Sequence, residues 1–173
     1  MPNKTNDWRI EGLEKSHQRA EFRCGRTPLD DFLRMLAGQY HKRNLGRTYV
    51  AVRPGEKRVY GYYTLASGSV SVQDLPDDAS RNLPRHPIPM ILLARLAVDE
   101  GVQGQGLGYV LLVDALKRCL ELAALLGVHA VEVDAIDQQT ETFYRKHGFI
   151  LLRDRPLHLY LPIATIRKVH GGK

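Results

Sequence analysis

The chain has 173 residues, of which 43% are hydrophobic and 25% charged. That balance is typical of a globular protein, and we expect a single domain over residues 1–173. No apolar signal segment opens the sequence and no stretch is long enough to span a bilayer, so a cytoplasmic protein without a membrane partner is expected. Cys24 and Cys119 lack metal-ligand spacing, which favours reduced, buried thiols and no metal site.

The net charge of +6 is unevenly distributed. From Arg145 to Lys173 bases outnumber acids seven to one, and residues 22–47 carry six bases against two acids. Basic surfaces of this kind attract anionic partners, among them nucleic acids and coenzymes. Solvated bases that only keep the protein soluble explain the charge equally well.

The first half of the chain combines strand patterns with one helix. Alternating or β-branched residues predict strands at 8–13, 48–52 and 59–72. A helix is predicted to start with Thr27 as N-cap and Pro28 at its first position, and to reach about Tyr40. Four prolines in residues 73–89 predict a long loop, and loops of that length are often functional.

The second half alternates strands and helices. Strands are predicted at 90–98, 128–133, 149–152 and 157–161. Amphipathic helices are predicted at 107–126, ended by Gly127, and at 138–147, ended by Gly148. The order β-α-β-β-β-α-β-α-β-β describes an α/β (α+β) domain, with a mixed central sheet flanked by helices.

A glycine-rich loop joins the predicted central strand to the long helix. Glycines let a backbone approach a phosphate closely, and the helix start offers unpaired N–H groups, so the loop predicts an anion site. It is not a Walker A motif, because Gly106 and Gly108 precede Leu and Tyr. It also lacks the acidic residue of a dinucleotide fingerprint. The alternatives are a plain flexible turn and a nucleotide-binding loop of another kind.

Two motifs resemble those of the GNAT acetyltransferase superfamily. The first, which follows the central strand, is Gln103-Gly104-Gln105-Gly106-Leu107-Gly108. The second is Phe143-Tyr144-Arg145-Lys146-His147-Gly148-Phe149. The resemblance implies the GNAT fold and an N-acetyltransferase with acetyl-CoA as acetyl donor. One departure is visible, because the family often has Asn and Ala where this chain has Asp137 and Thr140.

The resemblance also implies roles for individual residues. Pyrophosphate would lie on the loop backbone, pantetheine would pair with the central strand, and the Val98 N–H would polarise the thioester carbonyl. Tyr144 would protonate the leaving sulfur; the alternative is a tyrosine that only packs on the sheet. The implied cofactor-binding residues are Leu96, Ala97, Val98, Gln103, Gly104, Gln105, Gly106, Leu107, Gly108, Asp137, Thr140, Phe143 and Lys146.

The central strand offers no carboxylate as a general base. Many lysine-modifying relatives have a Glu there, whereas this chain reads Arg95-Leu96-Ala97-Val98. A lysine amine, with a pKa of about 10.4, needs such a base, but an α-amine, at about 7.7–8.0, is already partly neutral. The sequence therefore favours an α-amine substrate. We expect Arg95 to pair with Glu132 or Asp134 or to contact an anionic substrate.

Several short segments resemble the GNAT toxins of bacterial toxin–antitoxin modules. They are Phe22-Arg23-Cys24-Gly25, Leu29-Asp30-Asp31-Phe32-Leu33, Gly46-Arg47-Thr48-Tyr49-Val50, Tyr62-Tyr63-Thr64-Leu65-Ala66 and Ile88-Pro89-Met90. This resemblance implies acetylation of the α-amine of aminoacyl-tRNA, which blocks translation. It also implies a homodimer and a ribbon-helix-helix antitoxin.

The basic residues near the N-terminal helix are the candidates for contacting tRNA. They are Arg34, Lys42, Arg43 and Arg47. Two other functions stay open: a GNAT enzyme that acetylates a small amine or a protein N-terminus, and a non-catalytic acyl-CoA-binding regulatory module. Tyr144, in its motif, argues against the regulatory module.

Overall fold

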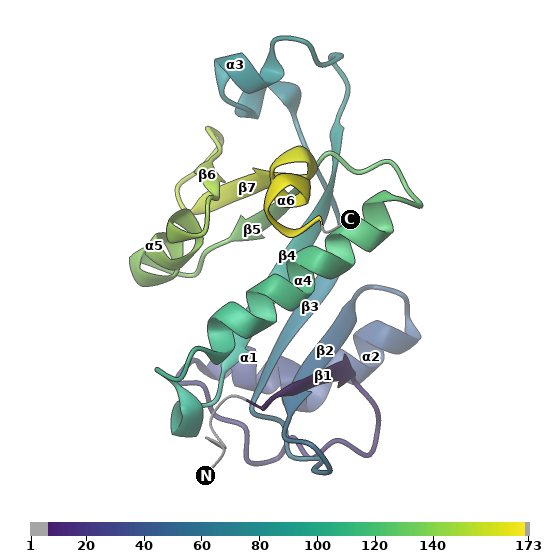
Figure 1. Cartoon of the computed structure of the whole chain (residues 1–173), viewed down its shortest axis with the longest axis vertical. Coiled ribbons are helices and arrows are strands. Elements are labelled where there is room, and N and C mark those ends of the chain that lie inside the picture. Colours follow the sequence, from purple (N-terminus) through teal and green to yellow (C-terminus); the bar gives the residue numbers. More distant parts are fainter. Residues whose placement is uncertain (1–6, 172–173) are drawn as a thin grey trace. The chain divides into compact units, whose positions relative to one another are not determined.

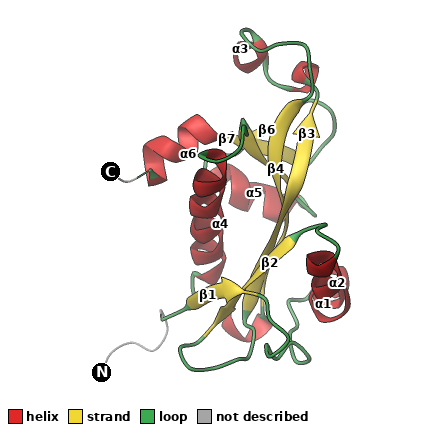
Figure 2. Cartoon of the chain, turned by 90° about the vertical axis from the view of Figure 1, so that its right-hand side faces the viewer, coloured by secondary structure: helices red, strands yellow, loops and turns green. Residues whose placement is uncertain are grey.

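The computed structural model describes residues 7–171, and Figures 1 and 2 label its strands and helices. The strands are β1 (Arg9–Gly12), β2 (Arg47–Val52), β3 (Gly61–Val70), β4 (Ile88–Val98), β5 (Ala130–Asp134), β6 (Ile150–Leu151) and β7 (His158–Pro162). They form one sheet in the order β1-β2-β3-β4-β5-β7-β6. Strands β4 and β5 pair in parallel, whereas β2 pairs antiparallel with β1 and β3, and β7 with β5 and β6. The predicted mixed sheet is confirmed.

Helical segments of different types lie between the strands and after the last one. They are α1 (Thr27–Asp31), the π-helix η1 (Phe32–Leu36), α2 (Ala37–Lys42), the 3₁₀-helices η2 (Val72–Asp74) and η3 (Glu100–Val102), α3 (Asp77–Ser80), α4 (Leu107–Ala123), α5 (Gln138–Lys146) and α6 (Ile163–His170). Contacts divide the chain into two compact units. The first comprises the residues up to Ala66 with Ala94–Ala115, and the second comprises Ser67–Leu93 with the residues from Leu116 onward. The single domain stays a prediction.

The first unit packs the N-terminal helical segment against the sheet. Phe32 and Leu33 are buried in one core cluster with Val50 and Tyr62, and α2 lies beside β2 (Figure 2). A π turn holds more residues than an α turn, so it rotates the side chains that follow it. Leu36, which α-helical spacing places on the buried face, is accordingly 40% exposed.

The start of that helix differs from the prediction. Thr27 is its first residue, and the N-cap is Arg26, which has extended backbone and makes no side-chain cap. The carboxylate of the buried Asp30 instead accepts a hydrogen bond from the Cys24 N–H, at 2.8 Å. The acid in the first turn therefore fixes the approach of the chain to the helix.

The second unit contains a helix that the sequence did not predict. Helix α6 begins directly after β7 and lies against β5 and β7 (Figure 1). It buries Ile163 and Ile166, and the Ile163 N–H donates to the carbonyl of His129 at 2.9 Å. Two buried residues give only a weak helical pattern, although Pro162 at the N-cap marks the boundary between the strand and the helix.

Two predicted helix ends have different outcomes. Gly148, with φ +95°, follows the C-cap His147 of α5 and confirms the predicted stop. Helix α4 ends at Ala123, earlier than predicted, and Gly127 has no positive φ, so its predicted role as a capping glycine is wrong. The predicted loop at 73–89 contains the short helix α3, and β4 begins two residues early, at Ile88.

Candidate active site

The glycine-rich loop has the conformation of an anion cradle. It lies between η3 and α4, and Gly104 and Gly106 have φ of +81° and +85°, where glycine is strongly favoured. The N–H groups of Gly104, Gln105 and Gly106 donate no hydrogen bond to any atom of residues 7–171. The first turn of a helix has no intrahelical acceptors for its N–H groups, so the loop and the start of α4 together offer a row of N–H donors to a phosphate.

A buried carboxylate holds the approach to this loop. Asp99, which is 5% exposed, accepts from the Gly101 N–H at 2.9 Å through Oδ1 and from the Arg23 N–H at 3.0 Å through Oδ2. The Glu100 N–H also donates to the Arg23 carbonyl, at 2.7 Å. The segment before the loop is thereby fixed to a distant part of the first unit.

Gln103, a predicted cofactor ligand, uses its side chain for structure. Its Nε2 donates to the carbonyls of Cys24, at 3.0 Å, and Val98, at 2.9 Å. The amide therefore anchors the first residue of the loop. If Gln103 contacts the cofactor, it does so through its backbone, and this contact stays a prediction. The cofactor contacts of the remaining loop residues, up to Gly108, also stay predictions.

Strand β4 continues beyond its pairing with β5. The parallel register runs from Met90↔Ala130 to Leu93↔Val133, whereas β4 extends to Val98. Among the three residues predicted to pair with pantetheine, Ala97 is buried, and Leu96 and Val98 are half-buried. Pairing of the cofactor with this stretch, and polarisation by the Val98 N–H, stay predictions.

Arg95 does not form the ion pair predicted for it. Its guanidinium lies 3.7 Å from the centroid of the Phe32 ring, which is a cation–π contact. Glu132 and Asp134 have other cationic partners, His158 and Arg155. The aromatic partner comes from a helix more than sixty residues earlier, and no sequence spacing indicated it.

The start of α5 is built by two predicted cofactor ligands. Asp137 is the N-cap, and its Oδ1 accepts from the Thr140 N–H and hydroxyl, both at 2.8 Å. This pair performs the capping that the helix start requires. The structure thus gives both residues a local role, and their contacts with the cofactor stay predictions.

Tyr144 lies in an aromatic environment on α5. It is 4% exposed, with ring centroids 5.3 Å from Phe143 and 5.2 Å from Phe149. Burial raises the pKa of its hydroxyl above the ordinary value of a tyrosine. Its hydroxyl makes no hydrogen bond within residues 7–171. A protonated hydroxyl that makes no other hydrogen bond is suited to donate a proton. Lys146, a predicted cofactor ligand on the same helix, is exposed.

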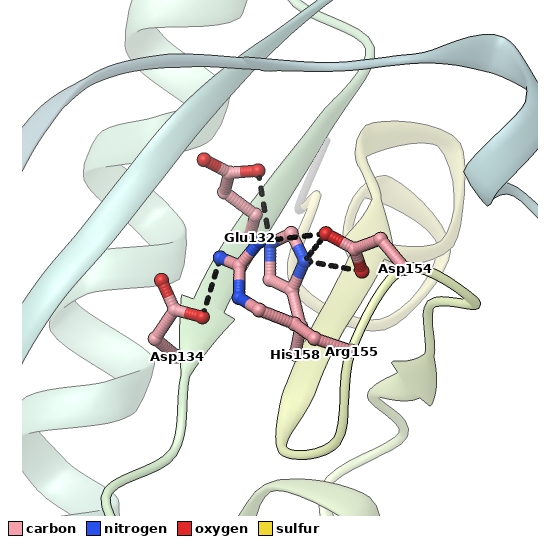
Figure 3. Close-up of polar contacts among 5 residues, drawn as sticks. All are labelled: Glu132, Asp134, Asp154, Arg155 and His158. Atoms are coloured by element: carbon pink, nitrogen blue, oxygen red, sulfur yellow. Dashed lines mark hydrogen bonds and ion pairs between the residues drawn. The ribbon is translucent and has the colours of Figure 1, made fainter.

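A cluster of charged residues on β5, on β7 and in the turn between β6 and β7 was missed by sequence reasoning (Figure 3). The nearly buried His158 has its Nε2 3.3 Å from Glu132 and its Nδ1 2.9 Å from Asp154. Arg155 lies 2.7 Å from Asp134 and 2.6 Å from Asp154. Burial by itself lowers the pKa of His158, but the two carboxylates outweigh it and the pKa is raised.

The predicted RNA-binding residues divide into two groups. Arg34 lies 3.8 Å from Asp30, and Arg47 donates to the carbonyl of His41 and to Asn44, both at 2.9 Å, so these two also stabilise the local structure. Lys42 and Arg43 make no side-chain hydrogen bond or ion pair within the part of the chain that the structure describes.

A hollow of about 290 Å³ brings two of those residues together with other bases. It is lined by Leu13, Glu14, Lys15, Arg19, Arg34, Met35, Gly38, Gln39, His41 and Lys42. Five of the ten lining side chains are basic residues or histidine and one is acidic, so the hollow favours an anion. Arg43 and Arg47 do not line it.

The described part of the chain contains neither a metal-ligand cluster nor a helix that could cross a membrane. Within residues 7–171, no three His, Cys, Asp or Glu side chains are placed to hold a metal ion. No helix in that range combines the length and apolarity needed to cross a membrane.

Residues 44–151, more than half of the chain, match the family model described as an acetyltransferase (GNAT) domain. The chain belongs to the GNAT acetyltransferase family. This confirms the fold and the enzyme class, an N-acetyltransferase that uses acetyl-CoA.

Known toxins are similar to this GNAT protein over nearly its whole length. The tRNA-acetylating toxin of Mycobacterium tuberculosis is 43% identical over 150 residues, which cover 87% of this chain and 89% of the toxin. The structure of AtaT complexed with acetyl-methionyl-tRNAfMet has a TM-score of 0.88 at 30% identity and covers 94% of this chain and 99% of its own. A mutant AtaT toxin bound to the C-terminus of the antitoxin AtaR and acetyl-CoA has a TM-score of 0.82 at 28% identity, covering 96% and 100%.

Substitution of Gly106 by Val tests the anion cradle. It is expected to weaken acetyl-CoA binding about tenfold or more, because the branched side chain disfavours a φ of +85° and blocks the backbone from the phosphate. Gly55→Val is the matched control, since Gly55 also has positive φ, +78°. A Cβ at this position would have no atom within 4 Å. Calorimetry should show unchanged affinity in the control. Equal affinities in the two variants would place the phosphates elsewhere.

Proposed function

We propose that this GNAT acetyltransferase is a toxin that acetylates the α-amine of aminoacyl-tRNA and thereby blocks translation. The observation that carries the proposal is the 43% identity to a tRNA-acetylating toxin over most of both chains. The basic charge of the chain and the lack of a carboxylate on 95–98 support it independently, since RNA is an anion and an α-amine needs little help to lose its proton.

In the proposed mechanism, the loop and Tyr144 have separate tasks. The N–H groups of residues 104–106 hold the pyrophosphate of acetyl-CoA, and the main chain of residues 96–98 pairs with the pantetheine. The neutral α-amine attacks the thioester carbonyl, which the Val98 N–H polarises. As the carbon–sulfur bond breaks, Tyr144 gives its proton to the thiolate. The attacking nitrogen loses one proton to water as the amide forms, and Tyr144 takes a proton back from water, so both the amide and the tyrosine end neutral.

The proposed partners follow from the same similarity. The structure of AtaT with the C-terminus of AtaR supports an antitoxin for this chain, and we place it in the ribbon-helix-helix class. We also propose that the protein is a homodimer and that it acts in the cytoplasm, where aminoacyl-tRNA is available. Coexpression with a small ribbon-helix-helix protein encoded next to this chain should restore growth that the chain alone arrests.

The substrate is tested with radiolabelled acetyl-CoA and purified tRNA. The protein should label aminoacyl-tRNA and leave uncharged tRNA unlabelled, because only the charged form carries the amine. A free amino-acid ester, a polyamine and a peptide with a free N-terminus serve as competing acceptors. Efficient acetylation of a polyamine or peptide together with none of aminoacyl-tRNA would leave the acetyltransferase standing and overturn the toxin.

Lys42 and Arg43, two basic residues at the end of α2 without side-chain partners in residues 7–171, provide a test of tRNA binding. Lys42→Ala with Arg43→Ala should weaken tRNA binding and flatten its dependence on salt by about one to two units in a log–log plot, as loss of phosphate contacts requires. Acetyl-CoA affinity should be unchanged, which calorimetry checks. If filter binding gives the wild-type salt slope, these two residues are only solvated.

A further inference from the structure

The connection between β3 and β4 forms a hollow of about 650 Å³ in the second unit. The connection includes η2 and α3 and lies at the top of Figure 1. Its lining residues are Ser71, Val72, Gln73, Ser80, Arg81, Leu83, Arg85, His86 and Pro87. A volume of this size suits a ligand of about nucleotide dimensions.

The basic side chains of this connection line the hollow, and its acidic side chains do not. Arg81, Arg85 and His86 line the hollow, whereas none of the three carboxylates of the same connection does. One of them, Asp77, lies 2.8 Å from Arg153, which lowers the pKa of its carboxyl. The hollow therefore presents positive charge without an acidic residue in its lining, although the connection itself is rich in acids.

The two arginines of the hollow have no partner elsewhere in residues 7–171. No hydrogen bond, ion pair or ring contact is made by Arg81 or Arg85, whereas the neighbouring Arg153 is paired with Asp77. Arginine holds five donors in a rigid fork that matches phosphate oxygens. Two such forks and the hydroxyl of Ser71 form a donor-rich wall, whereas the Ser80 hydroxyl donates to the Asp77 carbonyl at 3.1 Å.

The hollow is held by packing beneath it. Leu75, which is 1% exposed, and Ile88 belong to a core cluster with Leu152 and Tyr160, against which Leu83 packs. The Asp74 carbonyl also accepts from the Arg153 N–H at 2.9 Å. These contacts fix both ends of the connection, so its polar wall is attached to a structured base.

The geometry points to a binding site for backbone phosphates of RNA in the hollow of residues 71–87, which, given the proposed function, engages the tRNA substrate. Arg, Ser and Gln side chains are among those that contact phosphate and sugar in nucleic-acid complexes, and they supply affinity without reading bases. An acidic protein segment is less suited, because the hollow offers only three apolar side chains, Val72, Leu83 and Pro87, to anchor it.

The test is Arg81→Ala with Arg85→Ala, compared with Lys57→Ala and Lys117→Ala together. Both pairs remove two positive charges, but both lysines of the control are exposed and lie outside the hollow. The arginine pair should weaken aminoacyl-tRNA binding about tenfold and flatten the log–log salt dependence by about one to two units. The control should change both much less. Thermal unfolding should match the wild type, because neither arginine makes an intramolecular polar contact.

Two further measurements separate this site from the proposed function. Acetylation of a free amino-acid ester, which carries no phosphate, should be equal in the arginine variant and the wild type. Binding of uncharged tRNA needs no acetyl transfer, so it tests the hollow even if aminoacyl-tRNA is not the substrate. Equal tRNA affinity in the arginine and lysine variants overturns the proposal. Loss of antitoxin binding with unchanged tRNA binding overturns it as well, in favour of a protein ligand.

Discussion

Replacement of Tyr144 by Phe is expected to slow acetyl transfer about a hundredfold or more, the range for loss of a positioned general acid. Burial raises the pKa of Tyr144, so its hydroxyl keeps its proton at neutral pH and can give it to the departing thiolate. Affinity for acetyl-CoA should stay unchanged, because the ring remains. Single-turnover transfer and calorimetry measure the two quantities separately.

Tyr160→Phe is the matched control. Tyr160 is a second buried tyrosine of the same unit, on β7, whose pKa burial also raises. It lies outside both GNAT motifs, so loss of its hydroxyl should leave the transfer rate near that of the wild type. A Tyr144→Phe protein with the full single-turnover rate would instead reduce Tyr144 to an aromatic packing residue.

The second large effect is expected on stability, from His158→Leu. The substitution leaves Glu132, only 6% exposed, without its cationic partner, and breaking a buried pair in this way costs about 3 kcal/mol in the free energy of unfolding. The double variant with Glu132→Leu removes both charges and should regain much of the loss. Urea unfolding near pH 6 measures both. A single variant as stable as the wild type would show that the pair contributes nothing.

The same cluster gives stability a defined dependence on pH. The folded pKa of His158 is raised, so its contribution is complete below the ordinary histidine value of about 6.5 and is lost as pH rises through the folded pKa. Burial by itself raises the pKa of Asp154, but the His158 hydrogen bond outweighs it and the pKa is lowered. The contribution of Asp154 is therefore lost as pH falls. The cluster stabilises the fold most in the mildly acidic range between the ordinary pKa values of aspartate and histidine. The free energy of unfolding of the His158→Leu protein should lack this maximum.

Local patterns were sufficient to predict the fold and the position of the loop. Gly104, Gly106 and Tyr144 lie in short motifs whose neighbours in sequence are also their neighbours in space, so one strand, one turn and one helix define them. The stop of α5 before Gly148 was predictable for the same reason, since a position with positive φ just after a helix favours glycine.

Roles that depend on distant partners were not predictable. The Gln103 amide is bound to the carbonyl of Cys24, 79 residues away, and Arg95 lies over Phe32. The His158–Glu132 pair depends on the register between β5 and β7, in which Glu132 is opposite Tyr160 and so diagonal to His158. Sequence alone fixes neither the pairing of strands nor their register, so these contacts had no local signal.

The attachment of the glycine-rich loop bears on how this enzyme can evolve. Its structural contacts are made by the side chains of Asp99 and Gln103, which precede the cradle, and by Leu107, which is buried behind it. Gln105, which lies between Gln103 and Leu107, is exposed and makes no such structural contact. Under the proposed mechanism the N–H groups of this stretch hold the coenzyme, so substitutions of Gln105 are expected to change coenzyme affinity in small steps while the fold is preserved. Selection can then act on coenzyme affinity and on folding separately.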